Sequence, residues 1–324
     1  MMKEKKQPLD VIAIGDANID LIMRVPHHPN TDPKSDRGTA VRGWWYTLGP
    51  GGAAANVAAG MARMGNRVGF IGVIGDDELG KTLRKNLSNC GIDISYLRTV
   101  PGYQTTLTSC FENREGQAVH YSCPGPTSIS EACLDLDYLN GSRMLFLCGH
   151  IMTQNEKTGQ LLLEAMRTAR KEGITIALDP GKFWLNMDLA PYVHEAVHAA
   201  DILLPNAYEA ELLSGCPQPR EGGKALLDKG IKVVAIKLGE TGCFVCTHDE
   251  AMEVPSFKTE VSSHLGAGDS FNSGFLHGYL RDWPLLKSAR FANASASLKV
   301  RYPGTQVGLP TEIEVETFLA KGSS

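Results

Sequence analysis

The sequence has no long apolar run and no excess of positive charge. No stretch approaches the roughly 18 consecutive apolar residues that indicate a transmembrane helix, so we expect no membrane partner. Lysine and arginine number 32 against 36 acidic residues, and the net charge of −4 predicts no general attraction to nucleic acid. The opening MMKEKKQPLD is charged and lacks the apolar core of a secretory signal, so we expect a cytoplasmic protein.

Closely spaced metal ligands are also scarce. Eight cysteines are scattered along the chain, and among them only Cys243 and Cys246 form a CxxC pair. That pair lies in GCFVCTHD, which alternates like a strand, so the two side chains are expected to face opposite ways. The histidines offer only the adjacent His27 and His28. We interpret the cysteines as buried or half-buried thiols and predict no transition-metal site.

The chain does have a regular alternation of apolar strands and helices. At 324 residues, with 43% hydrophobic and 21% charged residues, its composition is that of an ordinary globular protein. Strands are expected at 11–15, 67–75, 143–149, 174–181, 201–206 and 232–239, and helices within 49–65 and at 77–91, 156–172, 189–199, 207–214 and 220–230. This alternation predicts an α/β fold, a mostly parallel central sheet with helices on both faces.

The segment 103–123 interrupts this alternation. Its sequence, YQTTLTSCFENREGQAVHYSC, has two strands of alternating polarity around the turn ENREGQ, and we predict a hairpin. Such strands suit a sheet with one solvated face, unlike the buried strands of the central sheet.

Polar residues follow several of the expected strands, in GDANID, DPG, PNAYE and GETG. Because right-handed crossovers bring the carboxyl ends of parallel strands to one edge, we expect these residues to meet there, where ligands usually bind.

Small residues lead directly into an acid in LGAGDSFNSGF, residues 265–275. Gly266, Ala267 and Gly268 precede Asp269, and apolar residues then recur at helical spacing. Backbone N–H groups at a helix start favour an anion, and a carboxylate beside them can accept a proton from a hydroxyl that attacks a phosphate. The stretch alone is equally consistent with a plain helix start, in which Asp269 is a first-turn acid.

Two signatures in order identify a family. GPGGAAANVAAGMARMG (49–65) and LGAGDSFNSGF look like the N-terminal and C-terminal signatures of the ribokinase-like, or PfkB-type, carbohydrate kinases. GDANIDLI, LLPNAYEAELLSG, KLGETGCF and ARFANASASLKVRYPG fit the same pattern, so the resemblance covers nearly the full length. It implies a single ribokinase-like kinase domain over 1–324 that uses ATP and Mg²⁺ to phosphorylate a small-molecule sugar. It also implies a small β lid, from about 19–48 and 103–123.

The resemblance implies a role for each residue that matches the motifs. Asp269 resembles the catalytic base, and the backbone of Gly266, Ala267 and Gly268 the anion hole. The substrate-binding positions are Asn18, Asp20, Gly51, Gly52, Asn56 and, less directly, His150. The cofactor-binding positions are Asn206, Lys237, Gly239, Gly242 and Asn293, and Glu209 serves Mg²⁺, largely through water.

Several of these residues have a simpler interpretation. Asp20 can be a capping or turn acid, and Glu209 a first-turn acid that faces the helix dipole. Lys237, a charge at the end of an apolar strand, can reach the ATP phosphates or pair with an acid. Asn293 can lie near the adenine or face solvent from a helix.

The chain departs from the family pattern in two places. The family often has Asp-Thr ahead of the anion hole, where the Asp belongs to a monovalent cation site, but this chain has Ser263 and His264. A serine brings no charge to balance K⁺, so activation by K⁺ is not expected. Ribokinase itself has a sugar-contacting Glu near the position of His150, which argues for a sugar other than ribose.

Two other functions are compatible with the sequence. A nucleoside kinase would share the fold and the base, and Trp44 or Trp45 would stack on its nucleobase. A sensor that binds ligand without turnover would keep the fold alone, although the intact Asp269 argues against it. An exposed lid edge also predicts a homodimer through the lid.

Overall fold

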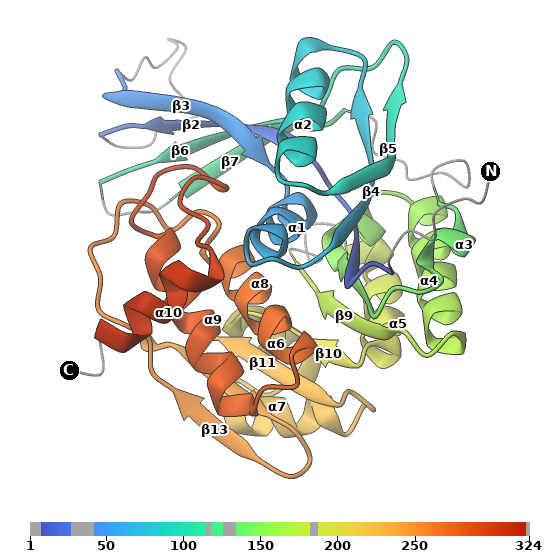
Figure 1. Cartoon of the computed structure of the whole chain (residues 1–324), viewed down its shortest axis with the longest axis vertical. Coiled ribbons are helices and arrows are strands. Elements are labelled where there is room, and N and C mark those ends of the chain that lie inside the picture. The colour runs from blue at the N-terminus through green and yellow to red at the C-terminus, as the bar shows by residue number, and fades with distance from the viewer. Residues whose placement is uncertain (1–7, 27–41, 115–117, 126–133, 182–186, 322–324) are drawn as a thin grey trace, which may run out of the picture.

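The computed structural model describes residues 8–26, 42–114, 118–125, 134–181 and 187–321, which form two sheets (Figure 1). The main sheet has nine strands in the order β13-β12-β11-β10-β9-β8-β1-β4-β5. Their bounds are β1 Val11–Ile14, β4 Val68–Gly75, β5 Asp93–Val100, β8 Met144–Cys148, β9 Thr175–Asp179, β10 Ile202–Leu203, β11 Val233–Lys237, β12 Cys243–Cys246 and β13 Ala251–Val254.

The predicted parallel sheet is confirmed. Strands from β11 across to β5 pair in parallel, and β12 is antiparallel to both β11 and β13. Each of the six predicted apolar strands is present. β10 is shorter than expected because Pro205 has no N–H to donate to a neighbouring strand. The sequence pattern did not predict β5, whose residues DISYLRTV mix charged and apolar side chains, or the short β13.

Helices cover both faces of the main sheet. Their bounds are α1 Ala53–Arg63, α2 Glu78–Asn89, α3 Leu136–Leu139, α4 Glu156–Lys171, α5 Ala190–Ala199, α6 Ala207–Ser214, α7 Pro219–Leu227, α8 Ala267–Leu280, α9 Leu285–Lys299 and α10 Glu312–Lys321, with 3₁₀ turns η1 Gly149–Thr153 and η3 Gly239–Thr241. Along β1, Ile12 and Ile14 belong to the core that includes residues of α4, α5 and α7, whereas Val11 and Ala13 belong to the core that includes residues of α1, α8 and α9. This alternation fixes a core on each face of the sheet.

The small sheet lies to one side of the main sheet (Figure 1) and has the order β3-β2-β6-β7. Its strands are β2 Asn18–Arg24, β3 Trp45–Gly51, β6 Leu107–Glu112 and β7 Ala118–Cys123. The predicted hairpin is present as β6 and β7, which pair antiparallel. β3 extends three residues beyond the 19–48 segment expected for the lid, and residues 27–41 of that segment lie outside the described residues.

None of the helices in the described ranges is long and apolar enough to cross a membrane.

Candidate active site

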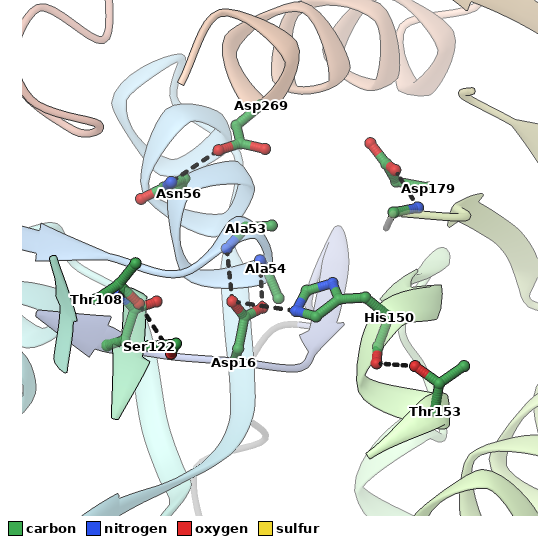
Figure 2. Close-up of polar contacts among 12 residues, drawn as sticks. Asp16, Ala53, Ala54, Asn56, Thr108, Ser122, His150, Thr153, Asp179 and Asp269 are labelled. Atoms are coloured by element: carbon green, nitrogen blue, oxygen red, sulfur yellow. Dashed lines mark hydrogen bonds and ion pairs between the residues drawn. The ribbon is translucent and has the colours of Figure 1, made fainter. Parts of the chain in front are cut away.

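Side chains from five separate elements meet where the strands of the main sheet end. Figure 2 shows Asp16, Asn56, His150, Asp179 and Asp269 pointing toward a common region. Asp16 follows β1, His150 lies in η1 after β8, and Asp179 ends β9. The expectation that polar residues after the strands gather at one edge is therefore confirmed.

Asp269 lies in the first turn of α8, behind the glycine loop. Gly266 is the N-cap of that helix with φ of 76°, and a Cβ there would come within 2.5 Å of the Thr305 carbonyl oxygen, so only glycine fits without strain. Asn56 donates from Nδ2 to Asp269 Oδ2 at 2.7 Å. Burial raises the pKa of Asp269, the hydrogen bond from Asn56 lowers it, and the charge of Asp179 raises it further, so that the pKa is about 7. The carboxyl is therefore poised to exchange a proton near neutral pH.

Asp20 is a second buried carboxyl, and it is held on both of its oxygens. Asn18 Nδ2 donates to Oδ1 at 2.5 Å, and Thr305 Oγ1 donates to Oδ2 at 2.7 Å. Burial raises the pKa of Asp20 to about 6. Gly51 gives this carboxyl its room, because a Cβ at that position would lie 2.0 Å from Oδ2. Neighbouring Gly52 has φ of 97°, which also requires glycine.

Asp16 and His150 form a pair beside the start of α1 (Figure 2). Asp16 accepts from the amides of Ala53 at 2.9 Å and Ala54 at 3.1 Å, and His150 Nε2 lies 3.5 Å from its Oδ2. Burial opposes both charges, but the pairing outweighs it: the pKa of Asp16 is lowered and that of His150 is raised. The pairing therefore favours the charged form of each group, and the two charges offset each other.

Lys237 pairs with an acid, which is one of the two alternatives that the sequence left open. Its Nζ donates to Asp179 Oδ2 at 2.7 Å and to Asn272 Oδ1 at 3.2 Å, and Asn272 Nδ2 donates to the same Asp179 oxygen at 2.6 Å. Burial lowers the pKa of Lys237, but the charges of Asp179, Glu209 and Asp269 together with the hydrogen bond to Asp179 outweigh it, and the net effect is a raised pKa. A Cβ at Gly268 would lie 3.9 Å from Nζ, so this ammonium also lies against the glycine loop.

Asn206 and Glu209 form a capping box at the start of α6. Asn206 Oδ1 accepts from the Glu209 amide at 2.9 Å, and Glu209 Oε2 accepts from the Asn206 amide at 2.8 Å. Asn206 also bridges to Lys237 through the backbone. Burial raises the pKa of Glu209 to about 8, and the charge of Asp179 adds to it. Glu209 is therefore an acid in the first turn of α6, as the simpler interpretation of the sequence anticipated. Its other oxygen, Oε1, takes no part in the capping box.

The remaining predicted cofactor positions flank the end of β13. Gly242 has φ of 113°, and a Cβ there would lie 2.1 Å from the Val254 carbonyl oxygen, whereas Gly239 borders open space. Asn293 is buried and does not face solvent: its Nδ2 donates to the carbonyls of Val254 at 2.9 Å and Pro255 at 3.1 Å. Asn293 therefore fixes the chain that follows β13.

The described cysteines are buried or half-buried thiols except Cys123, which is exposed. Burial raises the pKa of Cys243 to about 12 and that of Cys246 to about 11. Cys148 brings its sulfur within 4.8 Å of the ligand atoms of Asp16 and His150. Burial raises the pKa of Cys148 well above its usual range, and Asp16 already accepts two amides, so we assign no metal to this group.

Sequence reasoning missed four residues of this region. Asp16 and Asp179 lie in GDANID and DPG, which were noted only as polar segments that follow strands, so proximity to a strand end was the available signal. Asn272 lies within LGAGDSFNSGF but was given no role there, and no local pattern marks Thr305.

Known structures and relatives resemble this chain over nearly its full length. A ribokinase from Arabidopsis thaliana, solved with ribose and ATP, has a TM-score of 0.79 at 24% identity and covers 97% of this chain and 99% of its own. A 5-dehydro-2-deoxygluconokinase from Geobacillus kaustophilus is 26% identical over 98% of this chain and 95% of its own length. A ribokinase from Haemophilus influenzae is 28% identical over 94% and 97%.

The fold is that of the ribokinase-type kinases, which act on sugars or nucleosides. The chain belongs to the pfkB family of carbohydrate kinases, whose model matches residues 9–312.

Proposed function

We propose that the protein transfers a phosphoryl group from ATP to a sugar hydroxyl, with Asp269 as general base. The observation that carries this proposal is the carboxyl of Asp269, with a pKa of about 7, directly behind a glycine loop at a helix start. The sugar oxygen attacks the terminal phosphorus of ATP, its proton passes to Asp269, and ADP leaves with the electrons of the broken bond. The amides of Gly266, Ala267 and Gly268 face the charge that develops on the phosphoryl oxygens.

Asn56 supports the placement of the sugar. Its Nδ2 is committed to Asp269, and its buried Oδ1 has no hydrogen-bond partner among the residues that the structure describes. A buried acceptor without a partner is costly, and a substrate hydroxyl would satisfy it. We assign Asn18, Asp20, Gly51, Gly52 and His150 to the same side. Gly52 caps α1, the helix that carries Asn56, and Gly51 lies against Asp20, which binds Asn18. His150 pairs with Asp16, which accepts from the first amides of α1.

The opposite side suits a nucleotide and Mg²⁺. Asp179 and Glu209 supply carboxylate oxygens, the ligands that Mg²⁺ prefers, and the raised pKa of Glu209 means that a nearby cation would favour its ionised form. Bound Mg²⁺ would neutralise charge on the ATP phosphates. We assign Asn206, Lys237, Gly239, Gly242 and Asn293 to the nucleotide and propose that Glu209 acts through water.

The small sheet is proposed as the lid of this single domain. β2 carries Asn18 and Asp20, so movement of this sheet would reach the sugar side directly. Closure would exclude water, which competes with the sugar for the phosphoryl group.

The tryptophans give no support to the nucleoside alternative. Trp45 pairs with Arg24, at the end of β3 opposite to the Gly51–Asn18 pair. Six residues of strand separate the two ends by roughly 20 Å, so Trp45 is remote from the substrate side.

A substrate panel tests the proposed function. Pentoses, hexoses, sugar acids and nucleosides are each incubated with ATP and Mg²⁺, and both ADP release and the phosphorylated product are measured, with Asp269→Asn as the blank. Turnover of a sugar or sugar acid supports the proposal, and turnover of nucleosides alone would replace it with the nucleoside kinase. Binding without product would point to the sensor.

A further inference from the structure

A fully buried lysine lies beneath the glycine loop. Lys299, the last residue of α9, has 0% of its surface exposed. Its Nζ donates to the carbonyl oxygens of Gly304 at 2.6 Å and Tyr302 at 3.2 Å. Within the described part of the chain, no carboxylate oxygen lies within 4.0 Å of this ammonium. Burial of a charge without such a partner is expensive, so the position calls for a functional reason.

The lysine stem contacts the loop that carries the proposed anion hole. A Cβ at Gly266 would lie 3.2 Å from Lys299 Cε and 2.5 Å from the Thr305 carbonyl oxygen. The glycine loop, the lysine and the 302–305 loop are therefore stacked in van der Waals contact. The charges of Asp269 and Glu112 both act on Lys299, and they oppose the burial that lowers its pKa to about 8.

The loop held by Lys299 continues to the sugar side. Thr305, one residue beyond Gly304, donates from Oγ1 to Asp20 Oδ2 at 2.7 Å and to the Pro50 carbonyl at 3.0 Å. A displacement of the carbonyls at 302 and 304 would consequently move both the support of Gly266 and a hydrogen-bond partner of Asp20.

Backbone carbonyls that converge on one cation are the coordination that K⁺ finds in proteins, and an ammonium with three N–H donors satisfies the same oxygens. Ser263, whose amide donates to the Val300 carbonyl at 3.1 Å, brings no carboxylate that would hold a free cation near this loop. Its buried Oγ donates to Glu112 Oε1 at 3.2 Å.

We propose that Lys299 is a positioning residue that acts as a tethered monovalent cation: it fixes the 302–305 loop under the anion hole and adds positive charge there. This inference rests on the proposed function for its effect on catalysis, but not for its effect on stability. The protein then needs no free monovalent cation, because the side chain already occupies the carbonyl site.

Thermal unfolding in KCl, NaCl and choline chloride at equal ionic strength tests the site without any turnover. The wild-type melting temperature should be the same in all three salts. In Lys299→Ala, which leaves the carbonyls facing a vacated space, K⁺ or ammonium should raise the melting temperature above that in choline, because a cation that binds only the folded state stabilises it. Lys287→Met, on the exposed side of the same helix, is the matched control.

Kinetics with the substrate found in the panel test the catalytic part. Wild-type kcat should not depend on the salt. Lys299→Met should lose about tenfold or more in kcat, with a smaller change in the KM for ATP. In Lys299→Ala, K⁺ or ammonium should restore part of the lost kcat. Strong K⁺ activation of the wild type, or no cation-specific response in Lys299→Ala, would overturn the inference. If Lys299→Met does not fold, the wild-type salt comparison still decides. A wild type without kinase activity would sink the proposed function and leave the unfolding test intact.

Discussion

Asn56 and Asp269 are joined by a 2.7 Å hydrogen bond that links α1 to α8. The two helices carry the two signature segments of the sequence, and this bond is the point where they meet. It stabilises the charged form of Asp269. The side-chain oxygen Oδ1 of Asn56 remains available to accept a hydrogen bond from a ligand. The Asn56 side chain thus contacts the proposed base and also offers an acceptor to a substrate hydroxyl.

Asp269→Asn should keep ATP and sugar binding and lose roughly 10²-fold or more in kcat, because an amide cannot take up the proton. Binding is measured by calorimetry and kcat by ADP release. Asp249→Asn, an exposed acid between β12 and β13, is the matched control and should retain activity. Near wild-type turnover in Asp269→Asn would remove this residue from the role of base.

The same variant should not lose stability. The folded-state pKa of Asp269 is raised above its usual value, so the carboxyl favours the folded state at low pH, and that contribution is lost as pH rises through about 7. At pH 8 the neutral amide should therefore melt at or above the wild-type temperature. A large drop in melting temperature would attribute the kinetic loss to unfolding.

The pH profile of kcat/KM should rise through an apparent pKa near 7, since the base must be unprotonated to act. Asn56→Ala removes the hydrogen bond that lowers the pKa of Asp269, so the midpoint should move to higher pH. The profile of Asp249→Asn should match the wild type. A flat profile between pH 5 and 8 would show that Asp269 does not control the rate.

The sequence predicted the strands and helices that have a regular pattern of apolar residues. It did not predict contacts between residues that only the fold brings together. The parallel strands were recognisable because a strand buried on both faces is continuously apolar. β5 was missed because it has a mixed edge sequence. Asp269 could be proposed from glycine and acid in one stretch, whereas Lys299 looked like an ordinary charged residue at a helix end. Only the fold brings its ammonium to two carbonyls.

Thr305→Val should raise the KM for the sugar by roughly 10-fold or more, because loss of a hydrogen bond to a charged group costs about 1.5–3 kcal/mol. The valine keeps the shape but removes the donor to Asp20 and Pro50. The KM for ATP should change little. Thr305→Ser restores the hydroxyl and should recover most of the affinity; equal KM values in all three proteins would show that Thr305 does not position Asp20.

Glu209→Gln should raise the Mg²⁺ concentration needed for half-maximal activity several-fold, because an amide is a weaker ligand for Mg²⁺ than a carboxylate. The glutamine oxygen can still accept from the Asn206 amide, so α6 should keep its capping interaction. Glu211→Gln, an exposed acid on the same helix, is the matched control. Identical Mg²⁺ titrations for Glu209→Gln and the wild type would remove Glu209 from the metal region.

The small sheet should pair with that of a second copy through its β3 edge. Among the described strands, β3 pairs only with β2, and its large apolar side chains are exposed, with Tyr46 at 68% and Leu48 at 53%. An apolar strand edge of this kind favours pairing or aggregation unless it is covered. Sedimentation should therefore show a dimer for the wild type and a monomer for Leu48→Asp. Ile313→Asp, at an apolar site on α10 that is 75% exposed, should remain dimeric. A monomeric wild type at micromolar concentration would contradict this prediction without affecting the assignment of Asp269.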